Sequence, residues 1–155
     1  MNIFVVSPNQ KECAQMLDDK RLQKMILESA QMLSAALHRH GGNPPYKLSH
    51  KNHPCTLWTG DSRENYLWHL HLLHEMHLEY VSRRSKSHKS YTDCFLTLKS
   101  QAILIPERAL TPFANCSLYK DKQVFDAYKM TMKNKWENDK IVPRWTNSSR
   151  PEWSV

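Results

Sequence analysis

The sequence predicts an all-α fold, a compact single-domain bundle of about three long helices with a short N-terminal extended segment. Apolar residues recur at helical spacing in 18–40, 55–84 and 121–138. The chain has only 3 glycines, and its 8 prolines lie mostly at candidate segment ends, which argues against a sheet of hairpins. A length of 155 residues suits one domain with one core, spanning 1–155.

The first part of the chain carries recognisable helix-start signals. Residues 3–6 are a short apolar run that favours a brief strand or an extended arm. Ser7 is a good N-cap, with Pro8 at the first helical position, and this predicts a short helix over about 8–16. Asp18 is then placed to cap the central helix, which the two glycines at 41–42 end.

The later elements follow from similar signals. A second long helix within 55–84 is expected to begin near Asp61-Ser62, because Ser62 can cap it. The remaining expectations are a loop over 41–54, a basic serine-rich linker over 83–90, a short helix over 91–103 ended by Ile105-Pro106, and a last helix over 121–138.

Charge and composition indicate the kind of partner. The net charge is +7 with histidines neutral, which favours a polyanion such as nucleic acid, although many small basic proteins bind nothing in particular. No run of eighteen apolar residues is present, so no membrane span is expected. The 4 cysteines are far apart, contain no CxxC pair and follow no signal peptide, which predicts free thiols in a cytoplasmic protein.

The histidines of the second long helix resemble a metal motif without matching one. His71, His74 and His77 recur every third residue and therefore drift around the helix. The segment from His74 to His77 is one residue short of the HExxH spacing. The prediction is therefore no metal and no cofactor, with these histidines and His69 packed or hydrogen-bonded beside aromatic residues.

One acidic residue interrupts a cationic face of the central helix. Glu28 lies on the side of the helix opposite the apolar stripe, with Lys20, Arg21, Lys24 and Gln31. The cations could bind a phosphate backbone, and the carboxylate could transfer protons or stabilise an iminium ion. The alternative is that Lys24 and Glu28 form an ordinary i,i+4 surface pair.

Two further segments combine basic, amide and aromatic side chains. The loop residues Lys51, Asn52 and His53 suit phosphate and base contacts, but they also resemble any exposed loop. In the tail, the arginines can neutralise phosphate while the tryptophans stack on splayed bases, or the tryptophans can cover the core. These tail residues are Arg144, Trp145, Arg150 and Trp153.

The order of these pieces resembles the pyrimidine-dimer DNA glycosylase family, of the phage endonuclease V type, and its small phage-encoded relatives. The resemblance rests on Asp19, Leu22 and Glu28 in the first long helix and on the Asn52-His53-Pro54 segment before the second. It continues through the Ile105-Pro106 hinge to the aromatic and basic tail.

The resemblance implies an enzyme that cuts the glycosidic bond of a damaged pyrimidine and then nicks the backbone by β-elimination. In that family an N-terminal α-amine attacks the sugar and a carboxylate on the first long helix assists, which corresponds to Glu28 here. An α-amine has a reference pKa near ~7.7–8, so it is a better nucleophile at neutral pH than a lysine near ~10.4. Two positions differ from the family pattern: Asn2 follows Met1, where the family has a small residue, and Gln31 or Met32 replaces a cation.

The predicted partner is therefore duplex DNA, with the target base flipped out and the protein a monomer. The candidate catalytic residues are Glu28, Met1 and Asn2, and the candidate nucleic-acid contacts are Lys20, Arg21, Lys24, Gln31, Lys51, Asn52, His53, Arg144, Trp145, Arg150 and Trp153. The alternatives are a non-catalytic nucleic-acid-binding protein and an enzyme that cleaves another N-glycosidic bond.

Overall fold

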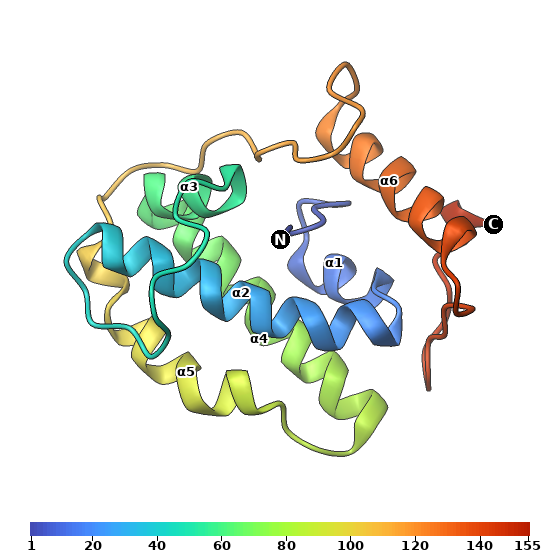
Figure 1. The fold of residues 1–155 in the computed structure, drawn as a ribbon, viewed down its shortest axis with the longest axis horizontal. Coiled ribbons are helices and arrows are strands. Elements are labelled where there is room, and N and C mark those ends of the chain that lie inside the picture. Colours follow the sequence, from blue (N-terminus) through green and yellow to red (C-terminus); the bar gives the residue numbers. More distant parts are fainter.

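A computed structural model of the chain describes residues 1–155 and contains helices but no strand (Figure 1). The all-α prediction is confirmed. The expectation of about three long helices is not matched exactly: α2, α4 and α6 are the longest of six α-helices, and two 3-10 turns accompany them. These are α1 Gln10–Met16, α2 Asp19–Arg39, α3 Pro54–Asp61, α4 Arg63–Arg84, α5 Lys89–Ser100, η1 Ala102–Leu104, α6 Val124–Asn138 and η2 Glu152–Ser154. None of the helices combines the length and the apolar character needed to cross a bilayer.

The segment predicted as one helix over 55–84 is divided at Ser62. This residue has an extended backbone (φ −149°, ψ 151°), and its hydroxyl accepts the backbone N–H of Asn65 at 3.0 Å. The predicted cap is therefore present. Residues 54–61 form a separate helix before it, and Arg63 donates its N–H to the carbonyl of Pro106 instead of continuing that helix.

Helix α2 lies at the centre of the molecule and packs against α3, α4 and α5 (Figure 1). Its predicted apolar stripe is buried, including Leu22, Ile26 and Leu33. The glycine stop is confirmed: Gly41 has φ +77°, and the N–H of Gly42 donates back to the carbonyl of Leu37 at 2.8 Å.

The N-terminal segment is an extended arm without a strand partner. Residues 3–6 are buried in the same hydrophobic cluster as α2 and α4, and in Figure 1 the arm lies between α3 and α6. Phe4 packs edge-on against Tyr128 of α6 with ring centroids 6.3 Å apart. The arm therefore belongs to the core, and its first residue has a defined position.

Two adjacent aspartates at the start of α2 connect distant parts of the chain. Asp18 is 1% exposed and accepts the indole N–H of Trp136 at 2.8 Å. Asp19 accepts the hydroxyl of Thr146 at 2.6 Å and the guanidinium of Arg83 at 3.1 Å. Burial alone would raise the pKa of Asp19, but the hydrogen bonds from Thr146 and Arg83 outweigh it and lower that pKa.

Arg83 does not lie in a solvated linker, contrary to the expectation for 83–90. It is part of α4 and is buried, and its guanidinium also donates to the carbonyl of Leu17 at 2.6 Å and of Gln15 at 3.1 Å. A buried guanidinium is stable when several nearby acceptors bind its N–H groups. The sequence pattern did not reveal these acceptors. Arg83 thereby holds the turn between α1 and α2 against α4.

His69, His74 and His77 of α4 are packed or hydrogen-bonded, as expected, whereas His71 is exposed and pairs with Glu75 at 3.2 Å. His69 is fully buried, with its two ring nitrogens 2.8 Å from the hydroxyl of Thr59 and 2.9 Å from that of Ser29. His74 is within 2.6 Å of the Tyr91 hydroxyl, and His77 stacks on the same ring at 3.8 Å. Burial lowers the pKa of His69 to about 3.

Acidification should therefore destabilise the fold from about pH 6.5 downward. In the folded state His69 stays neutral to about pH 3, whereas the unfolded chain takes up a proton near the reference pKa of ~6.5. Because the unfolded state binds more protons in this window, the free energy of unfolding falls as pH falls, by about 2 kcal/mol between pH 6.5 and 5 for this residue. Urea unfolding at a series of pH values measures the effect.

The His69→Gln variant isolates this contribution, since an amide does not titrate. Its free energy of unfolding should depend less steeply on pH than that of the wild type between pH 6.5 and 5. An equal pH dependence in both proteins, or titration of the His69 ring signals near pH 6 in the folded wild type, would contradict the assignment.

Candidate active site

The N-terminal amine lies beside the carboxylate of Glu28. The Met1 nitrogen is 3.7 Å from Oε2 of Glu28, which is 9% exposed. This buried oxygen accepts no hydrogen bond from the rest of the protein. Buried polar atoms are normally paired, and an exception calls for an explanation such as a catalytic role. The amine and the unpaired oxygen together are the strongest functional feature of the molecule.

The second oxygen of Glu28 faces the cation predicted to pair with it. Lys24 Nζ is 3.5 Å from Oε1, and the Lys24 side chain is 64% exposed. The ordinary i,i+4 pair is thus present. It does not account for the burial of Glu28 or for its approach to the amine, so the functional interpretation of this helix face stays a prediction.

The conformation of the arm places the amine. Asn2 accepts the backbone N–H groups of Ile3 at 2.8 Å and of Phe4 at 3.0 Å through Oδ1. Phe4 has φ +44°, a left-handed conformation that costs a residue with a side chain about 1–2 kcal/mol. The bonds to Asn2 and the burial of the Phe4 ring offset this cost. In this structure Asn2, a candidate catalytic residue, shapes the turn that directs Met1 toward Glu28.

A cavity of about 490 Å³ opens beside this pair. Its volume is within the range of about 300–1,000 Å³ typical of ligand sites. Glu28 is its only acidic residue, whereas Lys24, Lys135 and the amine are basic, so the cavity suits an anionic ligand. The lining consists of Met1, Asn2, Phe4, Lys24, Met25, Glu28, Cys116, Ser117, Leu118, Tyr119, Thr131, Asn134 and Lys135.

The far wall of the cavity was not anticipated from the sequence. It comes from the connector between η1 and α6, at residues 116–119, and from one face of α6. Thr131, Asn134 and Lys135 follow i, i+3, i+4 spacing, so they could have been recognised as a polar stripe on that helix. The connector residues carry no periodic signal.

The other predicted contacts on α2 lie away from the cavity. Arg21 forms two bonds to the carboxylate of Asp139, at 2.7 and 2.9 Å, and a third to Asp18 at 3.1 Å. Its guanidinium is therefore engaged within the protein. Lys20 is exposed and Gln31 is half-buried, and neither lines the cavity.

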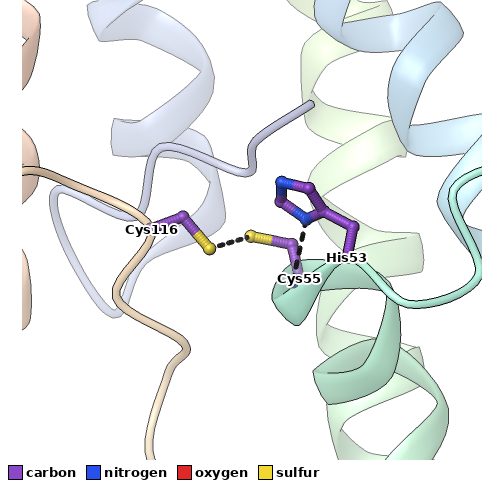
Figure 2. A group of neighbouring side chains, drawn as sticks. All are labelled: His53, Cys55 and Cys116. Carbon is purple, nitrogen blue, oxygen red and sulfur yellow. Dashed lines mark hydrogen bonds between the residues drawn. The ribbon is translucent and has the colours of Figure 1, made fainter.

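The predicted loop contacts separate into two groups. Lys51 and Asn52 are exposed and line a different hollow, next to the C-terminal half of α2. His53 is half-buried, caps α3 by accepting the N–H of Cys55 through Nδ1 at 3.1 Å, and lies next to the Cys55–Cys116 pair (Figure 2). Burial lowers the pKa of His53, and the positive Met1 amine lowers it further.

The two cysteines beside His53 form a close thiol pair. Their sulfur atoms are 3.1 Å apart, and Cys55 is the more deeply buried of the two. A hydrogen bond from the Cys55 thiol stabilises the Cys116 thiolate and lowers the pKa of Cys116. All four cysteines are free, as predicted.

The tail packs on α6 and beside α1. Trp145 donates its indole N–H to the carbonyl of Met16 at 2.9 Å and packs against Trp136, with centroids 5.1 Å apart. Trp153 also stacks on Trp136, with ring centroids 5.7 Å apart, but remains 36% exposed. Arg150 lies over Trp136 and Trp145, and together with Trp153 it lines a separate hollow of about 730 Å³. Arg144 is exposed.

The fold and the site together define a basic, all-helical protein in which the chain-terminal amine and a buried carboxylate share one cavity. A family model described as pyrimidine dimer DNA glycosylase matches residues 1–93, and the chain belongs to this family. Membership supports a DNA glycosylase function in general, with DNA as the substrate. The match contains Met1 and Glu28 but ends within α5, before the connector and α6.

Comparison with curated proteins and with solved structures gave no significant match.

The role of Asn2 in holding the arm can be tested by substitution, in a residue that also lines the cavity. In Asn2→Leu, a substitution of similar size, the N–H groups of Ile3 and Phe4 lose their acceptor, and the free energy of unfolding should fall by about 1–2 kcal/mol. The freed arm should also expose the Met1 amine, so acylation of that amine by an amine-reactive ester should be faster. Urea unfolding and peptide mass spectrometry measure the two effects.

The Asn2→Asp variant retains an oxygen acceptor and serves as the matched control. It should acylate at nearly the wild-type rate, with intact mass confirming that Met1 is present in each protein. Equal acylation rates for the leucine and aspartate variants would show that Asn2 does not hold the arm.

Proposed function

We propose that the protein is a DNA glycosylase with lyase activity that acts on a damaged or modified pyrimidine. In this proposal the α-amine of Met1 is the nucleophile and Glu28 is the assisting carboxylate. The observation that carries it is the 3.7 Å approach of the amine to a buried and unpaired oxygen of Glu28. The polar lining and the volume of the adjoining cavity support a nucleotide as its occupant.

The reaction proceeds through an imine. The unprotonated amine attacks C1′ of the sugar, the bond from C1′ to the base breaks, and the base leaves with a proton. The C1′–O4′ bond then breaks, O4′ takes a proton from water as the sugar ring opens, and a protonated imine forms between Met1 and C1′. The negative Glu28 stabilises this cation and then takes a proton from C2′, which expels the 3′ phosphate by β-elimination. Water releases the amine.

The target nucleotide must leave the helix stack to reach the amine. Lys24 and Lys135 stand on either side of the cavity, from α2 and α6, where they can hold phosphates next to an extruded nucleotide. The exposed Lys20, Lys51, Asn52 and Arg144 remain candidate contacts to flanking DNA. Arg21 would have to give up its aspartate partners first, so we assign it a structural role.

Borohydride trapping tests the nucleophile. A duplex that contains a cyclobutane pyrimidine dimer, or an abasic site, should become covalently linked to the protein when borohydride reduces the imine, and mass spectrometry should locate the link at Met1. Glu28→Gln should lower the rate of strand cleavage by about 10²–10⁴-fold, because the amide neither stabilises the cation nor takes the proton.

Glu137→Gln is the matched control, since it removes an equal charge at an exposed position on α6. It should cleave like the wild type. Absence of an adduct from a chain with a free Met1 amine, or normal cleavage by Glu28→Gln, would refute the mechanism. DNA binding without an adduct would point to the non-catalytic alternative.

The cavity lysine on α6 can be compared with a neighbour outside the cavity. Lys135→Gln should weaken duplex binding and reduce the slope of log affinity against log salt by about 1, the value expected for one lost phosphate contact. Lys133→Gln removes an exposed charge that does not line the cavity, and should change the slope less. Fluorescence anisotropy over a series of salt concentrations measures both, and equal slopes would contradict the assignment of Lys135.

A further inference from the structure

Three metal-ligating side chains from distant parts of the chain meet beside the N-terminal arm (Figure 2). His53 and Cys55 lie at the start of α3, and Cys116 approaches them from the connector before α6. One ligand atom from each residue lies within 4.8 Å of the others, and the two sulfur atoms are 3.1 Å apart. The sequence predicted no metal site, because the histidines of the second long helix lack metal-ligand spacing, and it did not bring these three residues together.

We propose that His53, Cys55 and Cys116 bind a thiophilic divalent cation, with Zn²⁺ the favoured ion. Two thiolates and an imidazole are a donor set that Zn²⁺ takes, whereas Mg²⁺ and Ca²⁺ prefer oxygen. With Zn–S bonds of about 2.3 Å, a tetrahedral ion holds its two sulfurs about 3.8 Å apart. The sulfurs therefore need to separate by only about 0.7 Å.

Capping of α3 does not by itself explain this arrangement. His88 caps α5 in the same way, by accepting the N–H of Ser90 through Nδ1 at 3.1 Å, and it belongs to no such group. His53 differs because two thiols lie within reach of its ring. Coordination through Nε2 would leave the cap of α3 intact.

A bound ion would fix one wall of the cavity. Cys116 lines the cavity and is followed directly by Ser117, Leu118 and Tyr119, which line it too. Binding would tie this connector to α3 and so hold the three side chains in place. Three protein ligands leave a tetrahedral ion one further position, which water or another ligand can fill.

The inference does not depend on the proposed function. Cys116 lies outside residues 1–93, which match the family, and binding of an ion requires no glycosylase chemistry. Failure of the metal test would therefore leave the imine mechanism unaffected, and failure of borohydride trapping would leave the metal site unaffected.

Titration of the reduced full-length chain with Co²⁺, in the presence of a phosphine reductant and without oxygen, tests the site. We expect one Co²⁺ per chain, with a near-ultraviolet sulfur-to-cobalt charge-transfer band and the intense visible bands of a tetrahedral ion. Added Zn²⁺ should displace the cobalt and remove both. Absence of these bands in the wild-type protein would overturn the proposal, and this test needs no substituted protein.

Single substitutions assign the ligands. Cys116→Ser, Cys55→Ser and His53→Asn should each weaken Co²⁺ binding at least tenfold, and the asparagine retains a capping oxygen for α3. Cys94→Ser and His88→Asn, which alter a buried thiol and a capping histidine outside the group, should bind as the wild type does.

Unchanged binding in Cys116→Ser and His53→Asn would also overturn the proposal. So would a chain isolated with a Cys55–Cys116 disulfide that binds no Co²⁺ after reduction, since that result would make the pair a redox couple instead. Circular dichroism of each variant separates the loss of a ligand from the loss of the fold.

Discussion

The arrangement of the whole molecule depends on two adjacent carboxylates at the start of α2, the buried Asp18 and the half-buried Asp19. Asp18 holds the indole of Trp136, and Asp19 holds the guanidinium of Arg83 together with the hydroxyl of Thr146. Because these partners come from α6, α4 and the tail, the pair fixes the start of the central helix against elements that are far away in sequence. Loss of Asp19 would leave the buried Arg83 with Glu79 as its remaining carboxylate partner, and weaker pairing of a buried charge is costly in a protein interior.

Helix α2 connects this anchored first turn to the candidate active site. Glu28 lies nine residues after Asp19, about 14 Å along α2. The arm approaches the same place from the opposite direction, through the turn at Phe4 and the side chain of Asn2. The distance between the Met1 amine and Glu28 is therefore set by two independent parts of the core. Such preorganisation is what a charge-stabilising catalytic group requires.

The features that sequence could predict are those with local causes. The stripe of α2, its glycine stop and the serine cap of α4 each follow from neighbouring residues, and Glu28 was identifiable because it breaks a cationic face. Features made by distant residues were not predictable. Arg21 was assigned to DNA because Asp139, its bidentate partner, is 118 positions away. The approach of Cys116 to Cys55 across 61 positions likewise has no periodic signature.

The burial of the arm has a practical consequence for anyone who produces this protein. An affinity tag or fusion partner joined ahead of Met1 would convert its amine into an amide nitrogen, which is no nucleophile, and would place extra chain at the cavity beside Glu28. At the opposite end Val155 is 94% exposed and outside the hydrophobic cluster. Purification handles therefore belong after Val155, because under the proposed mechanism a preparation extended ahead of Met1 would lack its nucleophile.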